Sequence, residues 1–162
     1  MWRAAHAAEA LVDIIGRLSA VAVLALVGIM SANVLLRYGF SMGSVWAQEF
    51  EWHLMSPIAL IGAAYALRHG EHVRVDVLYG RMGPKMQRAV DGVSSLLGFI
   101  CCFFVAWLSF RYVGQSWSQG EGSANPGGIP ARYALKAFIP AGFLLLALQF
   151  AALCLKSAAR PR

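Results

Sequence analysis

The chain has 162 residues, of which 59% are hydrophobic and 14% are charged, and its formal net charge at pH 7 is +6. Soluble domains carry about 25% charged residues, so this composition excludes an ordinary soluble domain and favours one single-domain protein in a lipid bilayer. The basic residues flank hydrophobic segments, which indicates membrane topology and contact with phospholipid headgroups and argues against nucleic-acid binding.

Four hydrophobic segments follow one another along the chain. A membrane helix needs about 20 mostly apolar residues, and backbone groups in lipid must be satisfied within the segment. The first segment is longer than the roughly 7–15 residues of a signal-peptide core, so we expect an uncleaved anchor. The sequence therefore predicts an all-α membrane protein, one domain over residues 1–162, with four transmembrane helices at roughly 12–36, 47–68, 86–113 and 132–155.

The distribution of Lys and Arg predicts the orientation of these helices. Ten of the 14 basic residues lie in the N-terminal segment, the connection between the second and third spans, and the C-terminal tail. Cytoplasmic loops carry the excess of Lys and Arg, so both termini are expected in the cytoplasm. Cys101, Cys102 and Cys154 lie inside apolar runs, where they are expected to pack as small apolar residues rather than form a disulfide framework.

Polar and aromatic residues gather where the first span ends and the second begins. These residues, the outer belt, are Asn33, Arg37, Tyr38, Trp46 and Glu49. Asn33 is expected to form a hydrogen bond between helices. Arg37 either extends to lipid headgroups or meets a periplasmic partner. Glu49 is either an interfacial acid favoured by the helix dipole, or pairs with Arg37 or a partner subunit.

The second span leaves the membrane through a further polar stretch. Arg68, His72 and Asp76 form an inner belt, with His69 and Glu71 between them. Their spacing matches no zinc motif, so no metal site is predicted. His72 and Asp76, four residues apart, are expected to orient a short amphipathic segment at the cytoplasmic surface or on another subunit.

Small residues in the second span predict close helix packing. Ala59 with Ala63, and Gly62 with Ala66, form small-xxx-small pairs that let two helix backbones approach, either within the bundle or against a larger membrane protein. The sequence shows no serine–histidine–acid set, no glycine-rich phosphate loop and no carboxylate pair between spans. We therefore expect neither an enzyme nor a bound cofactor.

Two blocks of residues resemble the small membrane subunit of tripartite ATP-independent periplasmic (TRAP) transporters, the DctQ-like family. The first block comprises Asn33, Arg37-Tyr38, Trp46, Glu49, Gly62-Ala63-Ala64, Ala66-Leu67-Arg68, His72 and Val75-Asp76. The second comprises Asn125 to Pro130, Arg132-Tyr133, Lys136, Phe138-Ile139-Pro140, Gly142-Phe143 and Leu148-Gln149.

The resemblance implies a non-catalytic scaffold subunit in the bacterial inner membrane. Its partners would be a large elevator-type membrane subunit, which holds the substrate and sodium, and a periplasmic binding protein that delivers an organic acid anion. The outer belt could help to dock that binding protein. Two alternatives remain open: a self-sufficient oligomeric four-helix transporter, and a membrane redox subunit that binds haem, for which His53 is the one histidine inside a span.

Overall fold

The computed structural model describes residues 2–71 and 79–159, and every regular element in these ranges is a helix. The all-α prediction is thus confirmed, and each helix is longer than the hydrophobic span predicted for it. The helices are α1 (Trp2–Gly39), α2 (Val45–His69), α4 (Pro84–Ser118) and α5 (Arg132–Ala159).

Local chemistry determines where these helices begin and end. The Ser44 hydroxyl accepts a hydrogen bond from the Ala47 N–H at 3.3 Å and caps the start of α2. Gly70 ends α2 with a φ of +78°, a left-handed conformation that favours glycine. Pro84 occupies the first turn of α4, where its missing N–H is not needed.

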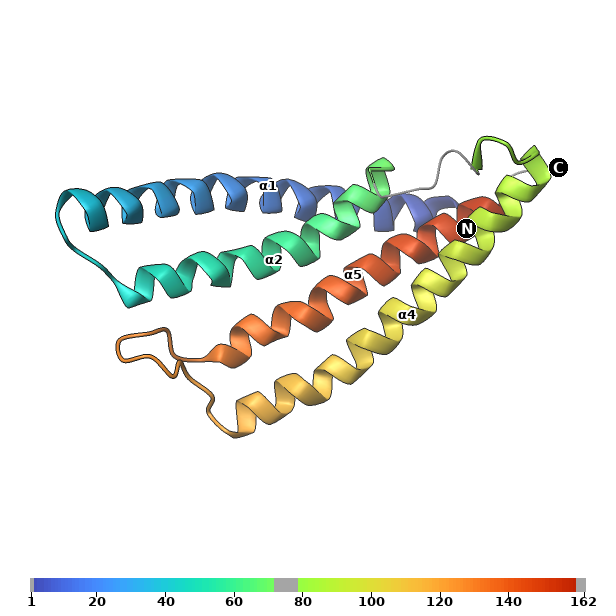
Figure 1. The fold of residues 1–162 in the computed structure, drawn as a ribbon. Coiled ribbons are helices and arrows are strands. Elements are labelled where there is room, and N and C mark those ends of the chain that lie inside the picture. Colours follow the sequence, from blue (N-terminus) through green and yellow to red (C-terminus); the bar gives the residue numbers. More distant parts are fainter. Residues whose placement is uncertain (1, 72–78, 160–162) are drawn as a thin grey trace.

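The four helices form a splayed layer rather than a compact bundle (Figure 1). Across the layer the order is α1, α2, α5 and α4, and α5 packs against each of the other three helices. The start of α1 and the end of α5 lie together at one end, here called the terminal end. The α1–α2 and α4–α5 connections lie at the opposite end, here called the loop end, where the helices diverge.

The layer buries little apolar surface. Its accessible area is 10817 Å², whereas a compact globular protein of this mass has about 7,900 Å². A small core of Val12, Ala64 and Leu145 joins α1, α2 and α5, and Ile15 and Ile61 pack against it. Most large hydrophobic side chains instead face outward, where lipid or another membrane protein must cover them.

Three of the helices are long and apolar enough to cross a membrane: Ala5–Gly39, Pro84–Ser118 and Arg132–Ser157. The helix α2 is not among them, because Glu49, Glu51 and His53 shorten its apolar part. The fourth span and the cytoplasmic position of the termini therefore stay predictions.

Gly142 allows close approach where α2 crosses α5. A Cβ atom added to Gly142 would lie 2.6 Å from the Leu60 Cβ and 3.3 Å from the Leu60 backbone carbonyl. Because backbone cannot swing aside, any larger residue here must push α2 away from α5. Gly28 in α1 has open space around it, with no atom within 4 Å of an added Cβ.

The substitution Gly142→Val should therefore destabilise the protein more than Gly28→Val, which introduces the same side chain into an equally apolar helix. We expect an overpacking cost of about 1–3 kcal/mol for the first variant only. Thermal unfolding of both variants in one detergent measures this difference. Equal unfolding temperatures would contradict the close α2–α5 packing.

Candidate functional site

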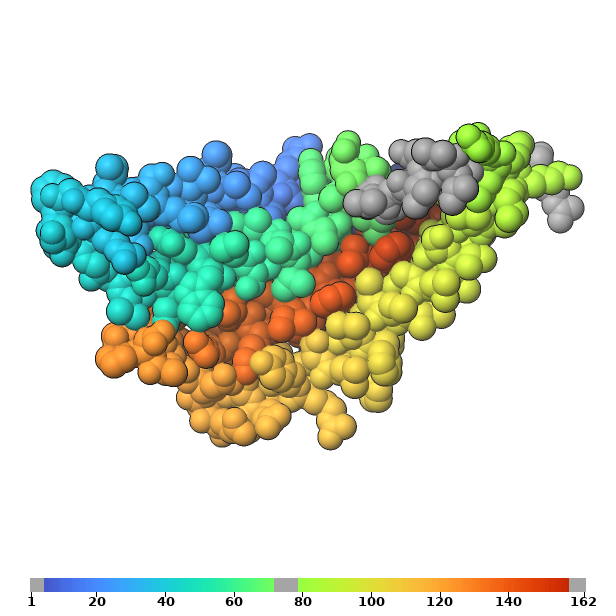
Figure 2. Space-filling view, in the orientation of Figure 1, coloured from blue at the N-terminus to red at the C-terminus, as the bar shows by residue number. Residues whose placement is uncertain are grey.

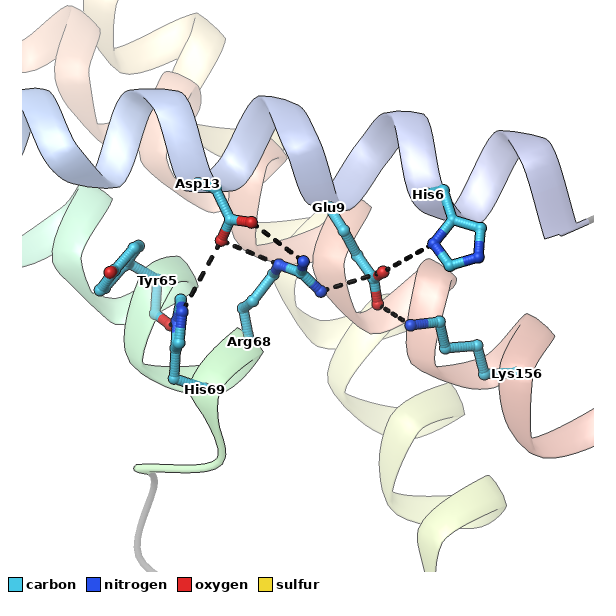
Figure 3. Close-up of polar contacts among 7 residues, drawn as sticks. All are labelled: His6, Glu9, Asp13, Tyr65, Arg68, His69 and Lys156. Atoms are coloured by element: carbon cyan, nitrogen blue, oxygen red, sulfur yellow. Dashed lines mark hydrogen bonds and ion pairs between the residues drawn. The ribbon is translucent and has the colours of Figure 1, made fainter.

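Charged side chains from three helices meet at the terminal end (Figure 3). The Arg68 guanidinium on α2 donates two hydrogen bonds to the Asp13 carboxylate on α1, each 2.9 Å long, and its third nitrogen lies 2.9 Å from Glu9. Lys156 on α5 donates to the other oxygen of Glu9. These four residues, Glu9, Asp13, Arg68 and Lys156, are named the ion cluster here, and they contribute two negative and two positive charges.

Because the ion cluster is partly buried, breaking one of its ion pairs would strongly destabilise the contact between the helices. The side chain of Glu9 is 3% exposed, so it depends on Arg68 and Lys156 for the interactions that water would otherwise supply. Removing one partner of such a buried pair leaves an uncompensated charge and typically costs about 3–5 kcal/mol. The cluster therefore holds α1, α2 and α5 in register.

Two histidines border the ion cluster. The His6 Nδ1 lies 3.6 Å from Glu9, and the His69 Nε2 lies 3.9 Å from Asp13. His69 also donates through its Nδ1 to the Tyr65 carbonyl at 3.0 Å. Protonation of either ring would add positive charge beside a carboxylate that already has a basic partner.

At the loop end, a second set of polar contacts joins residues that lie far apart in the sequence. The buried Glu49 carboxylate at the start of α2 accepts hydrogen bonds from the Ser123 hydroxyl, the Asn125 side-chain amide at 2.9 Å and the Ile129 backbone N–H at 2.7 Å. These four residues are named the loop clasp. They fix the α4–α5 connection, residues 119–131, onto α2, because three donors converge on one carboxylate.

The same connection is held to α4 and α5 by another acid. Glu121 accepts hydrogen bonds from Lys136 on α5 and, at 2.7 Å, from Ser116 on α4. The Lys136 hydrogen bond is the main reason why the pKa of Glu121 lies below its usual value, and Ser116 adds to the effect. The Lys136 ammonium also lies 4.2 Å from the centre of the Tyr112 ring.

The outer-belt residues predicted from the sequence have separate contacts in the structure. Asn33 donates to Glu51 at 2.9 Å, a hydrogen bond from α1 to α2 of the kind expected for it. Glu49 binds the α4–α5 connection instead of Arg37, because the chain returns that loop to the start of α2. Arg37 lies over the Tyr38 ring and Trp46 stacks on Phe50, and these belt residues face outward.

The structure describes one inner-belt residue and all four predicted packing residues. Arg68 belongs to the ion cluster, whereas His72 and Asp76 lie outside the described residues. Gly62 and Ala66 are half-buried, and Ala59 and Ala63 are exposed on α2. The fully buried small residue of α2 is Ala64, which the small-xxx-small pattern did not select.

Sequence reasoning missed most of the residues that hold the helices together. Glu9 and Asp13 are four residues apart, on one face of α1, just before a long apolar run. Two acids one turn apart at a membrane helix end are a signal for a basic partner on another helix. Glu49 and the segment from Asn125 to Pro130 stood in the two sequence blocks, but no local signal paired them, because Ser123 and Asn125 are common loop residues and Ile129 donates only through its backbone N–H.

Many of the polar groups at both ends bind one another. Within residues 2–71 and 79–159, no three His, Cys, Asp or Glu side chains are arranged to hold a metal ion. The Glu9 and Glu49 carboxylates have both oxygens occupied by donors from the chain itself. In the described part, Gln149 is fully buried with both amide atoms unpartnered.

The comparison with known proteins supports the family that the two sequence blocks resemble. Residues 26–160 match the model of the DctQ component of tripartite ATP-independent periplasmic transporters. The chain belongs to this family. The match includes Glu49 and the α4–α5 connection of the loop clasp, as well as the two basic residues of the ion cluster. This chain is thus a DctQ-family protein, a multi-pass protein of the bacterial inner membrane.

Individual relatives are small permeases of the same class. The chain is 32% identical over 95 residues, 56% of its length, to a putative TRAP transporter small permease protein of Haemophilus influenzae. It is 29% identical over 120 residues, 74% of its length, to the ectoine TRAP transporter small permease protein TeaB of Halomonas elongata. The matched segments span 59% and 61% of those two relatives.

A further relative is much longer than this DctQ-family chain. The match to the sialic acid TRAP transporter permease protein SiaT of Haemophilus influenzae is 30% identical over 88 residues, 54% of this chain. That match covers only 14% of SiaT.

The ion cluster predicts a large effect for Arg68→Gln. The variant leaves Glu9 and Asp13 without their shared cation, and we expect a loss of about 3 kcal/mol, the lower end of the range for a broken buried pair, because Arg68 is partly exposed. Thermal unfolding in detergent measures the loss. Arg111→Gln removes the same charge from an exposed position on α4 and is the matched control. Similar unfolding temperatures for the two variants would refute the role of the cluster.

The loop clasp predicts a local effect for Glu49→Gln. A glutamine keeps one acceptor oxygen, which serves Ser123 and Asn125 together, and its NH₂ group then faces the Ile129 N–H, which should lose its partner. Hydrogen exchange at Ile129 should become at least about tenfold faster, since a hydrogen bond to a charged group contributes about 1.5 kcal/mol or more. Glu51→Gln, which alters only the neighbouring carboxylate bound by Asn33, should leave Ile129 unchanged. The clasp is refuted if both variants exchange alike.

Proposed function

We propose that this chain is the non-catalytic scaffold subunit of a sodium-coupled TRAP transporter that imports organic acid anions. It would brace a large elevator-type membrane subunit, which binds the substrate and the sodium ions. The observation that carries the proposal is the exposed apolar surface of α1: only 6% of the residues in its most apolar stretch are buried. A partner in the membrane would cover such a helix.

The polar contacts within the chain support a static role. The ion cluster and the loop clasp use the charged groups of α1, α2 and α5 to fix helices and a loop in place. A subunit that moved cargo would need polar groups free to bind it at membrane depth. Internally paired charges are instead suited to a rigid frame against which another subunit moves.

The relatives support a large partner subunit. A segment similar to 54% of this chain forms 14% of the permease SiaT. A similar segment within one long polypeptide is consistent with permanent contact between the small and large parts. Two relatives are named for ectoine and for sialic acid, which are chemically different solutes. We infer that the small subunit does not select the solute, and the carboxylate class is proposed from the family resemblance.

The loop end is the proposed contact with the periplasmic binding protein. Tyr38 is 79% exposed and Trp46 is 52% exposed, and both lie beside the α1–α2 connection. Exposed aromatic residues and an Arg at the edge of a membrane protein suit a polar, reversible contact. The loop clasp would keep the neighbouring α4–α5 connection in a fixed shape for the same contact.

Co-purification and reconstitution test this function directly. The chain would be expressed with a large TRAP permease subunit and a periplasmic binding protein from the same genome, and the complex placed in liposomes. Uptake of radiolabelled pyruvate, lactate or succinate should need all three proteins and a sodium gradient. Uptake by this chain alone would establish a self-sufficient transporter instead, and a Soret band in the purified protein would establish a haem subunit.

Variants of the outer belt refine this experiment. Charge reversal by Glu49→Lys or Arg37→Glu should impair assembly or uptake more than Cys101→Ala or Cys102→Ala, which change small side chains in an apolar run. Quantities of co-purified large subunit and initial uptake rates provide the two measurements. If all four variants retained the same assembly and uptake, the outer belt would have no role in the proposed function.

A further inference from the structure

A groove lies between α2 and the end of α4, near the loop end. Its volume is about 470 Å³, and the first turns of α5 form its floor. In Figure 2 the beginning of α5, in orange to red, is recessed between α2, in teal, and the end of α4, in yellow to orange. Ala59 and Leu60 of α2 give the groove an apolar wall, and Leu135 and Ile139 of α5 give it an apolar floor.

Arg132 places a positive charge at this groove. It is half-buried, and its guanidinium lies 5.5 Å from the centre of the Trp52 ring. Stacking on an aromatic ring orients a guanidinium and leaves its N–H groups free to donate in the ring plane. In the described part of the chain, no side-chain hydrogen bond or ion pair engages this guanidinium.

The charged side chains near Arg132 form their hydrogen bonds with other residues. Lys136, also in the groove lining, binds Glu121. Glu121 and Glu49 are the acids near Arg132, and both accept their hydrogen bonds from other residues. Arg132 therefore has unused donors in a groove whose lining acid, Glu121, is paired with Lys136, which suits an anionic oxygen ligand.

We propose that this groove binds a membrane glycerophospholipid, with its phosphodiester on Arg132 and an acyl chain along the apolar walls. Three features favour a lipid over a soluble anion. Leu135 and Ile139 belong to α5, which is long and apolar enough to cross a membrane, the groove lies between the two helices α2 and α4, and Trp52 and Tyr112 are residues typical of the membrane interface. A lipid there would fill the space that the splay of α2 and α4 leaves open.

Native mass spectrometry of the full chain in detergent, with added phosphatidylglycerol, tests the proposal. Arg132→Gln should weaken lipid retention at least about tenfold, because a charge-assisted hydrogen bond is lost. Arg111→Gln is the control, because it removes an exposed Arg that is not part of the groove. Retention that is unchanged in Arg132→Gln, or equally weakened in both variants, would overturn the proposal.

A second pair of variants tests the acyl-chain position without touching the charge. Ala59→Phe adds bulk to the groove wall, whereas Ala63→Phe adds the same bulk one turn away, outside the groove. Only the first should reduce phosphatidylglycerol retention by several-fold. Equal retention in the two variants would refute an acyl chain in this groove. Circular dichroism confirms that each variant is folded.

Two further probes separate a lipid from a free anion. Diacylglycerol, which lacks the phosphate, should not be retained, and glycerophosphate, which lacks acyl chains, should not displace phosphatidylglycerol. Retention of diacylglycerol would remove the role of Arg132, and displacement by glycerophosphate would identify a site for soluble anions. The experiment uses this chain alone, so its result is independent of the proposed transport partners.

Discussion

The Arg68 guanidinium joins α1 and α2 at the terminal end, and the remaining helix arrangement depends on that junction. It binds the carboxylates of Glu9 and Asp13 together, and Lys156 brings α5 to the same point. In a compact domain a large apolar core would align the helices, but this layer buries few large side chains. Directional, charge-assisted hydrogen bonds supply the alignment instead. The helices converge at this cluster and separate toward the loop end.

The helices separate at the loop end, so a second set of polar contacts is required there to hold them. The same separation leaves space for a groove. Glu49 draws the α4–α5 connection onto α2, and Glu121 ties the same connection to α5 through Lys136. Between these contacts the flanking helices stay apart, so a groove remains over α5. A thin layer fixed at both ends can present broad apolar faces without collapsing on itself. The proposed scaffold role requires this property.

The residues that resemble the DctQ-like family gain a physical meaning from these contacts. Glu49 from the first sequence block and the 125–130 segment from the second lie far apart in the chain, yet Asn125 and Ile129 donate to Glu49 directly. Arg68 of the first block carries the ion cluster. Glu49, Arg68, Asn125 and Ile129 thus hold parts of the chain itself together. The sequence pattern alone left Glu49 either as an interfacial acid or as a pair for Arg37 or a partner subunit.

The sequence by itself determined the helical class and the polar character of both helix ends, because hydropathy and turn residues act over short stretches of chain. It also indicated the interhelical role of Asn33. The partners of Glu49 and the meeting of Glu9, Asp13 and Lys156 with Arg68 were decided only by the tertiary structure. Residues 74 to 80 positions apart, as in the loop clasp, become neighbours through the packing of α2, α4 and α5. No local pattern specifies which charged group another helix will bring, so those pairings follow from the helix order in the layer.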